Sequence, residues 1–224
     1  MRRLLFVALL ALAACVSARG AADTPAPFSD TAQAQTPAPP GSYPVAIDLP
    51  AGQYANDPNH SSVIWRIRHE GLAWLTGRFD RSTATLTLDP ADPSRSHLTA
   101  TIDAHSVSTS VTVANGQHAF DNSVQNMIGA DKTAQITFTS TRIERTGQNT
   151  ANVTGDLTMN GQTHPATLQV TFDGGHTDLL RGGKAALGFS ARATLTRSQW
   201  GITSYAQFAG DEVQLIIEME LLQS

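Results

Sequence analysis

The chain has 224 residues, of which 41% are hydrophobic, and this is enough for one substantial domain. Its formal net charge of −4 argues against nucleic acid as the main partner, because binding to a phosphate backbone needs a basic face. The only cysteine is Cys15, so the fold has to be held by its core and its hydrogen bonds, without an intramolecular disulfide.

The N-terminus has the features of a targeting segment. Arg2 and Arg3 precede an apolar run, Leu4–Ala14, that is too short to cross a bilayer and is typical of a signal-peptide core. The residues Leu12-Ala13-Ala14-Cys15 resemble the bacterial lipoprotein box, in which the cysteine is lipidated and becomes the first mature residue. The alternative is an ordinary secretory signal that is cleaved after Ala18. We therefore expect a signal peptide over residues 1–14 and a periplasmic protein that is anchored to the membrane through Cys15, or else a soluble periplasmic or secreted protein.

Residues 15–50 are dominated by Ala, Pro, Thr, Gln, Ser and Gly and have no hydrophobic periodicity. The many prolines would break a helix and would deny hydrogen-bond donors to a strand. We predict a disordered, partly polyproline-II tether. At about 3 Å for each of about 35 residues, it can reach on the order of 100 Å, which suits a domain anchored to a membrane.

The folded domain, residues 51–224, is expected to open with a hairpin over His60–Phe79. Apolar and polar residues alternate from Val63 to His69, which is the period of a half-buried strand. Gly71 is a natural turn position, after which the chain returns towards Phe79. Just before the hairpin, Asp57-Pro58-Asn59 is expected to form a turn.

Strand patterns continue to the C-terminus, interrupted by one helical pattern between Asn115 and Met127. Asn160-Gly161 is a strong hairpin signal, and a polar loop is expected from Gly174 to Gly183. No βαβ rhythm appears, so about eight or nine antiparallel strands are expected. The residues alone leave two architectures open, a closed barrel and a sandwich with a filled core. The later strand segments are Ser82–Leu88, Ser96–His105, Ala134–Arg142, Thr150–Met159, Gln162–Asp173, Lys184–Thr196 and Glu212–Leu221.

Several segments together resemble the YceI family of secreted bacterial proteins. They include the hairpin from His60 to Phe79, Ile136–Ser140, Gly155–Gly161, Arg197–Ile202 and Gly210–Val213. Each motif is modest, but their order and spacing are specific and extend over almost the whole folded part. The resemblance implies an all-β fold, an extended lipocalin-like antiparallel β-barrel of about eight strands with one short helical excursion. It also implies a long apolar tunnel that binds polyisoprenoid or similar lipids.

Residues with catalytic or metal-binding chemistry do not form a recognisable motif. The seven histidines are scattered, without a HExxH motif or a Cys/His cluster, so no metal site is predicted. No GxSxG elbow is present, and we expect no enzymatic activity. His69 is expected either to contact a polar lipid head or to be a residue of the barrel end. Arg197 is interpreted as a structural residue or as a cation–π partner of Trp200.

We predict non-enzymatic binding, transport or sequestration of an isoprenoid-type lipid, polyprenyl or quinone-like, in the bacterial cell envelope. The alternative is an envelope structural or interaction module with a filled barrel core and no lipid. No cofactor besides such a lipid and no nucleic-acid partner is expected, and the oligomeric state is left open, a homodimer included. The predicted ligand-contacting residues are Val63, Trp65, Ile67, Leu75, Phe79, Ile102, Phe138, Leu157, Phe172, Phe189, Leu215 and Ile217.

Small residues on the predicted inner faces are expected to leave room for a guest, because a filled core would favour larger side chains. These small residues are Gly77, Ala100, Gly155, Ala191 and Ala193.

Overall fold

The computed structural model describes residues 49–112 and 118–224. The predicted signal peptide, Cys15 and nearly all of the predicted tether lie outside these residues. No helix in the described part is both long enough and apolar enough to cross a membrane. The strands are β1 Gly52–His69, β2 Ala73–Phe79, β3 Ser82–Leu88, β4 His97–Asp103, β5 Val107–Ser108, β6 Gln135–Arg145, β7 Thr150–Met159, β8 Gln162–Asp178, β9 Lys184–Thr196 and β10 Ala209–Gln223. The helices are α1 Ala119–Met127 and the short 3₁₀-helices η1 Pro93–Arg95, η2 Ala104–Ser106, η3 Leu179–Arg181 and η4 Arg197–Trp200.

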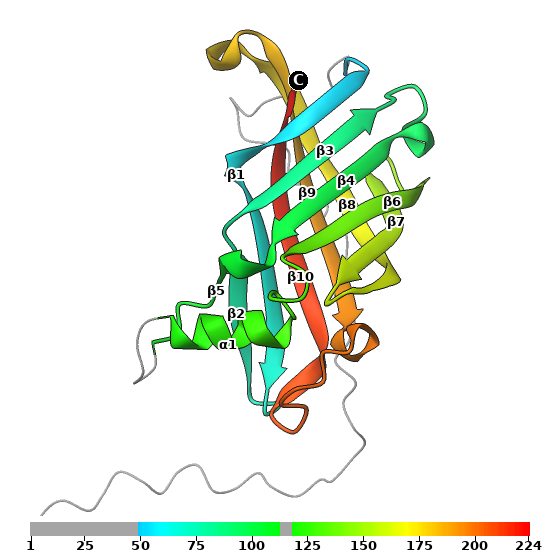
Figure 1. The fold of residues 1–224 in the computed structure, drawn as a ribbon. Coiled ribbons are helices and arrows are strands. Elements are labelled where there is room, and N and C mark those ends of the chain that lie inside the picture. Colours follow the sequence, from blue (N-terminus) through cyan, green and yellow to red (C-terminus); the bar gives the residue numbers. More distant parts are fainter. Residues whose placement is uncertain (1–48, 113–117) are drawn as a thin grey trace, which may run out of the picture. The chain divides into compact units, whose positions relative to one another are not determined.

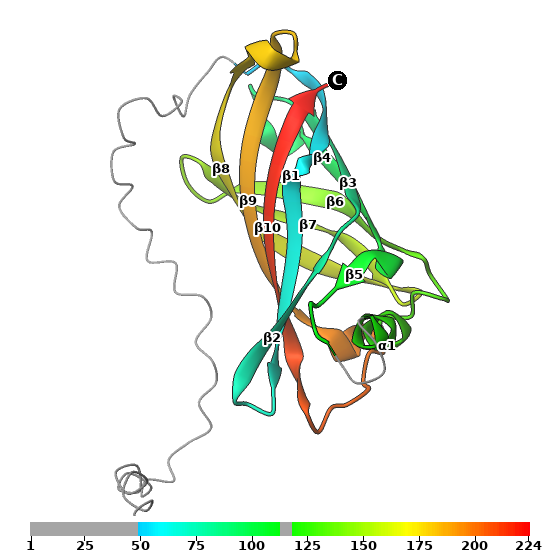
Figure 2. The same cartoon turned by 90° about the vertical axis from the view of Figure 1, so that its left-hand side faces the viewer.

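Eight of these strands close into an antiparallel barrel (Figures 1 and 2). Their order around the ring is β1, β3, β4, β6, β7, β8, β9 and β10, and β10 pairs back with β1. Closure removes the exposed strand edges that an open sheet of this size would present. The predicted antiparallel barrel with one short helix is therefore confirmed, and the sandwich is excluded.

Strand β1 is the longest element, and it has two successive partners on one side. Its first part, Gly52–Ala55, pairs with β3, and its last part, Val63–His69, pairs with β2. Between the two parts the ladder with β10 breaks at a bulge from Asn56 to Ser61. The side chain of Asn56 bridges this break, since its Oδ1 accepts from Ala84 N at 2.7 Å.

The turn predicted at Asp57-Pro58-Asn59 is wrong, because these residues form the bulge inside β1. Proline has no N–H to donate, so a position outside the hydrogen-bonded ladder suits it. β1 consequently starts at Gly52 rather than at His60. The predicted loop from Gly174 is wrong in the same way, because β8 continues to Asp178 after a register shift between Phe172 and Gly174.

Helix α1 starts at Ala119, and the expected start at Asn115 lies outside the described residues. Its apolar residues Phe120, Val124 and Met127 pack against Trp65 and other inner residues of β1 and β2. The helix lies at the same end of the barrel as the β1–β2 turn and the β9–β10 loop (Figures 1 and 2). We call this the helix end, made by α1, residues 70–72 and residues 201–208. The opposite end carries η3 at the tip of the β8–β9 hairpin.

Candidate functional site

The barrel encloses an apolar cavity of about 820 Å³. This volume lies within the range of about 300–1,000 Å³ that is usual for small-molecule sites. All twelve residues that the sequence predicts as ligand-contacting line this cavity, because alternate residues of each strand face inward. That they touch a ligand stays a prediction.

The cavity runs through the barrel and has polar groups mainly towards its two ends. At the helix end the lining includes His69, Arg197 and Ser204. On the side of the β6–β7 turn it includes Arg145 and Gln148. Between these ends the wall is formed by aliphatic and aromatic side chains, which can hold a hydrocarbon but offer it no hydrogen bonds.

Two of the small inner residues do not leave room for a guest, which corrects the expectation for Gly77 and Gly155. A β carbon on Gly77 would lie 2.6 Å from Cε2 of Trp65, and one on Gly155 would lie 2.5 Å from Cζ of Phe138. These glycines therefore accommodate aromatic side chains of the wall itself. Ala100 and Ala191 do line the cavity, whereas Ala193 does not.

Helix α1 forms one face of the cavity, and none of its residues is among the predicted ligand-contacting residues. Phe120, Val124, Met127 and the following Ile128 all line it. Their helical spacing is visible in the sequence, but which way the helix docks is not. Loop residues Tyr205 and Phe208 were also missed, since no periodic pattern marks them.

The buried carboxylate of Asp121 fixes α1 to the segment after β5. Its Oδ1 accepts from Thr109 N at 2.9 Å and from Thr109 Oγ1 at 2.6 Å, and His118 Nδ1 lies 3.2 Å from its Oδ2. Burial raises the pKa of Asp121, but the hydrogen bonds from Thr109 and His118 outweigh it and hold the pKa below its ordinary value. Asp121 therefore stays charged near neutral pH.

Arg197 is a buried structural residue that donates only to backbone carbonyls. Nε donates to Gly210 O at 2.8 Å, Nη1 to Ile202 O and Ser204 O at 2.7 and 2.9 Å, and Nη2 to Ala209 O at 3.2 Å. This confirms the structural interpretation of Arg197. Trp200 instead donates its indole N–H to Leu157 O at 3.1 Å and meets His164 edge-on.

His69 is the last residue of β1 and lines the cavity at the helix end, where it is exposed. Its backbone lies opposite Ala209 in the ladder with β10. This is the barrel-end position that was one of the two expectations for His69.

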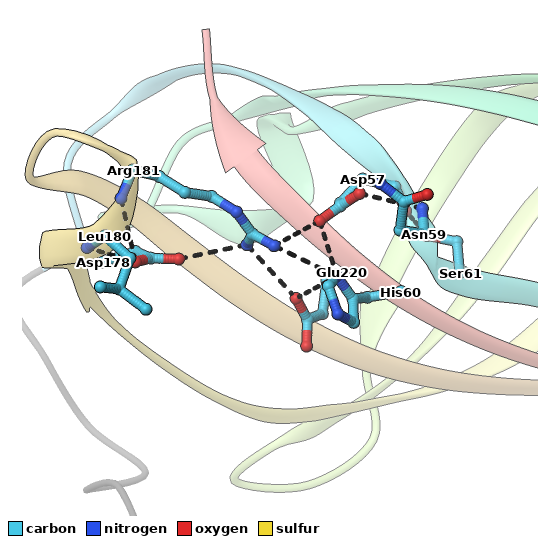
Figure 3. Close-up of polar contacts among 8 residues, drawn as sticks. All are labelled: Asp57, Asn59, His60, Ser61, Asp178, Leu180, Arg181 and Glu220. Carbon is cyan, nitrogen blue, oxygen red and sulfur yellow. Dashed lines mark hydrogen bonds and ion pairs between the residues drawn. The ribbon is translucent and has the colours of Figure 1, made fainter.

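A polar cluster outside the cavity brings together residues that are far apart in the sequence (Figure 3). The ligand atoms of Asp57, His60 and Glu220 lie within 4.8 Å of one another, close enough to share a metal ion. Arg181 from η3 already lies among them, with Nη2 at 2.5 Å from Asp57 Oδ2 and Nη1 at 3.6 Å from Glu220 Oε2. A guanidinium in this position supplies the positive charge that a metal would bring. We interpret these contacts of Asp57, His60, Glu220 and Arg181 as a structural cluster that joins β1, β10 and the β8–β9 tip, and we call it the staple.

Comparison with known proteins gives consistent results. The model of the YceI-like domain family matches residues 54–221. Protein YceI of Salmonella arizonae is 36% identical over 164 residues, which cover 73% of this chain and 82% of that protein. The crystal structure of Burkholderia cenocepacia BcnA superposes with a TM-score of 0.64 at 23% identity, over 74% of this chain and 98% of that one. A polyisoprenoid binding domain from Saccharophagus degradans has a TM-score of 0.56 at 10% identity, over 78% and 100% of the two chains.

Proposed function

The chain belongs to the YceI-like family, and on that premise we propose that its barrel binds an isoprenoid-type lipid, polyprenyl or quinone-like. The protein carries or sequesters this lipid in the bacterial cell envelope, by binding rather than by catalysis. The Saccharophagus degradans domain, which binds a polyisoprenoid and has the same fold, supports this class of ligand.

The observation that carries the proposal is the continuous apolar cavity. It is lined by every strand of the barrel and by α1, and its middle section has an aliphatic and aromatic wall. A flexible branched hydrocarbon fits such a wall, because it needs contact area and no precise polar partners. The filled-core alternative predicts side chains that meet at the barrel axis, which an 820 Å³ cavity does not support.

The energetics favour a long chain. Burial of one CH₂ group contributes about 0.8 kcal/mol, so an isoprene unit of about five carbons contributes on the order of 4 kcal/mol before the costs of binding. A few units inside the cavity therefore give useful affinity after those costs. Recognition by contact area alone also predicts tolerance of chain length.

The envelope location rests on the N-terminal sequence, and Cys15 is its testable residue. Replacement of Cys15 by Ser removes the only site for a lipid anchor. We expect a carbonate wash, which removes proteins held only by surface contacts, to release the variant from membranes and to leave the wild type attached. Equal retention of the two would refute the anchor without touching the proposal on the cavity.

The proposal is tested by native mass spectrometry of protein purified from its own host, with and without organic extraction. We expect an extractable hydrophobic molecule whose mass series is spaced by isoprene units. Ala100→Phe should reduce its content, because Ala100 lines the cavity from the middle of β4. The matched control is Thr99→Phe, since Thr99 is the neighbouring residue and is exposed on the outer face.

The comparison between the two variants separates occupancy of the cavity from general damage to the strand. Loss of the lipid in Ala100→Phe but not in Thr99→Phe supports the proposal. Equal lipid content in both, or protein that carries no lipid from its host, would refute it.

A further inference from the structure

Three large apolar side chains are exposed together at the helix end. Leu72 in the β1–β2 turn is 81% exposed, and Tyr205 and Phe208 in the β9–β10 loop are 57% and 46% exposed. Both segments project at the same end of the barrel, beside α1 (Figures 1 and 2). We call Leu72, Tyr205 and Phe208 the apolar rim.

The apolar rim is continuous with the cavity. Tyr205 and Phe208 line the cavity and are also exposed, so these two rings extend its apolar wall to the surface, beside the polar groups of His69 and Ser204. The two segments are joined directly, because Glu70 N donates to Phe208 O at 2.6 Å. The rim is therefore one surface rather than two unrelated exposed loops.

The backbone holds the rim in a defined conformation. Tyr205 has a φ of 57°, which is uncommon for a residue other than glycine and strains the backbone. Phe208 N and Ala209 N both donate to Tyr205 O, at 2.9 and 2.8 Å. A loop that merely connected β9 to β10 would need neither this backbone strain nor two exposed aromatic rings.

Residues beside the rim have the character of a membrane interface. The guanidinium groups of Arg66 and Arg68 each lie over the Trp74 ring, 4.6 Å from its centroid. Tryptophan and arginine with a long apolar stem suit the head-group region of a bilayer. The carboxylates of Glu70 and Asp211 lie at the same end, so attachment depends on apolar insertion more than on net charge.

A long isoprenoid cannot reach the cavity through water. Exposure of each CH₂ group to water is unfavourable, so a chain of several isoprene units stays dissolved in a membrane. An apolar path from the membrane to the cavity removes that barrier. We propose that the apolar rim docks on a phospholipid bilayer and is the portal through which the lipid enters and leaves, an inference that rests on the proposed function.

The opposite end of the barrel supplies a matched control. Leu179 and Leu180 in η3 are 84% and 99% exposed, more than any rim residue, but neither lines the cavity. If exposed apolar side chains alone attached the protein to membranes, this pair would matter as well. If the lipid enters through the portal, only substitutions in the apolar rim should slow its uptake.

The test uses donor vesicles of phosphatidylethanolamine and phosphatidylglycerol that contain a dansyl-labelled long-chain polyprenol. Every protein in the test carries Trp74→Phe, which removes the tryptophan beside the rim. The processed protein is added free or on acceptor vesicles, and energy transfer from the remaining tryptophans, of which Trp65 lines the cavity, reports arrival of the probe. We expect the triple variant Leu72→Ser, Tyr205→Ser, Phe208→Ser to take up the probe about tenfold more slowly, because three apolar anchors are lost. The double variant Leu179→Ser, Leu180→Ser should match the wild type.

A second probe separates the portal from the cavity. Dansyl-farnesol is short enough to be delivered from water, and its equilibrium binding is compared between the wild type and the single variant Leu72→Ser. It should be the same in both, because Leu72 is the rim residue that does not line the cavity. Slower uptake of the long probe by Leu72→Ser with unchanged binding of the short one supports the portal. The portal is overturned if the rim variant takes up the long probe at the wild-type rate, or if the Leu179 and Leu180 variant is slowed as much as the rim variant. It is also overturned if the rim variant has a changed oligomeric state, since the rim would then bind a second copy of the chain rather than a membrane. A wild-type protein that binds neither probe refutes the proposed function itself.

Discussion

Trp65 on β1 lies directly over Gly77 on β2, and the two residues are paired across the antiparallel ladder. A β carbon on Gly77 would lie 2.6 Å from Cε2 of the indole and closer still to Cζ2. The indole Nε1 is buried and has no hydrogen-bond partner, so packing alone sets the orientation of the ring. The position of this wall aromatic thus depends on the absence of a side chain at residue 77.

Gly77→Ala should destabilise the barrel by about 1–3 kcal/mol, because the added methyl forces either the indole or β2 to move. Trp65→Phe in the same chain should recover part of this loss, since it removes the ring atoms that clash. The double-mutant cycle, measured by urea unfolding, gives the coupling between the two residues.

Gly210→Ala is the control for this cycle, because its β carbon would meet Arg68 Cβ at 3.5 Å, an ordinary contact. An equal cost for Gly77→Ala and Gly210→Ala would show that the Trp65 contact does not matter.

The barrel wall could be predicted from sequence because the period of two assigns each strand residue to a face. Val63, Trp65 and Ile67 on β1, and Leu215 and Ile217 on β10, line the cavity for that reason. Closure into a barrel could not be derived from this alternation, since a sandwich has the same period, and it followed from the family resemblance.

Features that depend on packing could not be predicted. Gly77 looked like free space, but the space is filled by a residue on the neighbouring strand. The cluster of Asp57 with Arg181 joins residues 124 positions apart, and nothing local in the sequence links them. The exposed rings of Tyr205 and Phe208 lie in a loop, where no periodicity indicates which side chains face the solvent.

The staple at Asp57 predicts a dependence of stability on pH. The hydrogen bonds with His60 and Asn59 N, with a smaller effect of the Arg181 guanidinium, hold the pKa of Asp57 below its ordinary value despite its burial. The folded state therefore favours the ionised carboxylate, and this stabilisation is complete above the unfolded carboxyl pKa of about 3.9 and is lost as the pH falls through the lower folded pKa. The free-energy difference between the wild type and Asp57→Asn, measured by urea unfolding, should be constant above about pH 5 and shrink below it.

Removal of His60 tests the cause of that shift. His60→Ala takes away the largest stabilising contact of the carboxylate, so the pH at which stability is lost should move upward. A curve identical to that of the wild type would show that Arg181 and the backbone suffice.

Asp121→Ala should release α1 from the helix end of the cavity. The change leaves the buried N–H and hydroxyl of Thr109 without their acceptor, at a cost of about 2–3 kcal/mol. We expect faster amide exchange in α1 and faster release of a bound probe, with a smaller effect for Asp121→Asn, which keeps an acceptor oxygen. Ser123→Ala is the control, because Ser123 Oγ donates only to Ala119 O within the helix, and an equal effect of the two alanine variants would contradict the docking role.

Arg197→Lys should loosen the β9–β10 loop that presents Tyr205 and Phe208. The guanidinium donates hydrogen bonds to four backbone carbonyls, two in that loop and two at the start of β10. The ammonium group of a lysine cannot reproduce this planar arrangement of donors. We expect a loss of about 2–3 kcal/mol in unfolding free energy and faster proteolysis between residues 201 and 208.

The control is Arg142→Lys, which alters an exposed pair with Glu144 and should change stability by less than about 1 kcal/mol. If the rim is the portal, Arg197→Lys should also slow vesicle uptake of the long-chain probe while Arg142→Lys leaves it unchanged. The reason is that an anchor inserts effectively only when its backbone is already ordered, since ordering the loop on contact subtracts from the free energy of insertion. If Arg197→Lys lowers the unfolding free energy but keeps the wild-type uptake rate, the hydrogen bonds of Arg197 stabilise the fold and do not contribute to docking on the membrane.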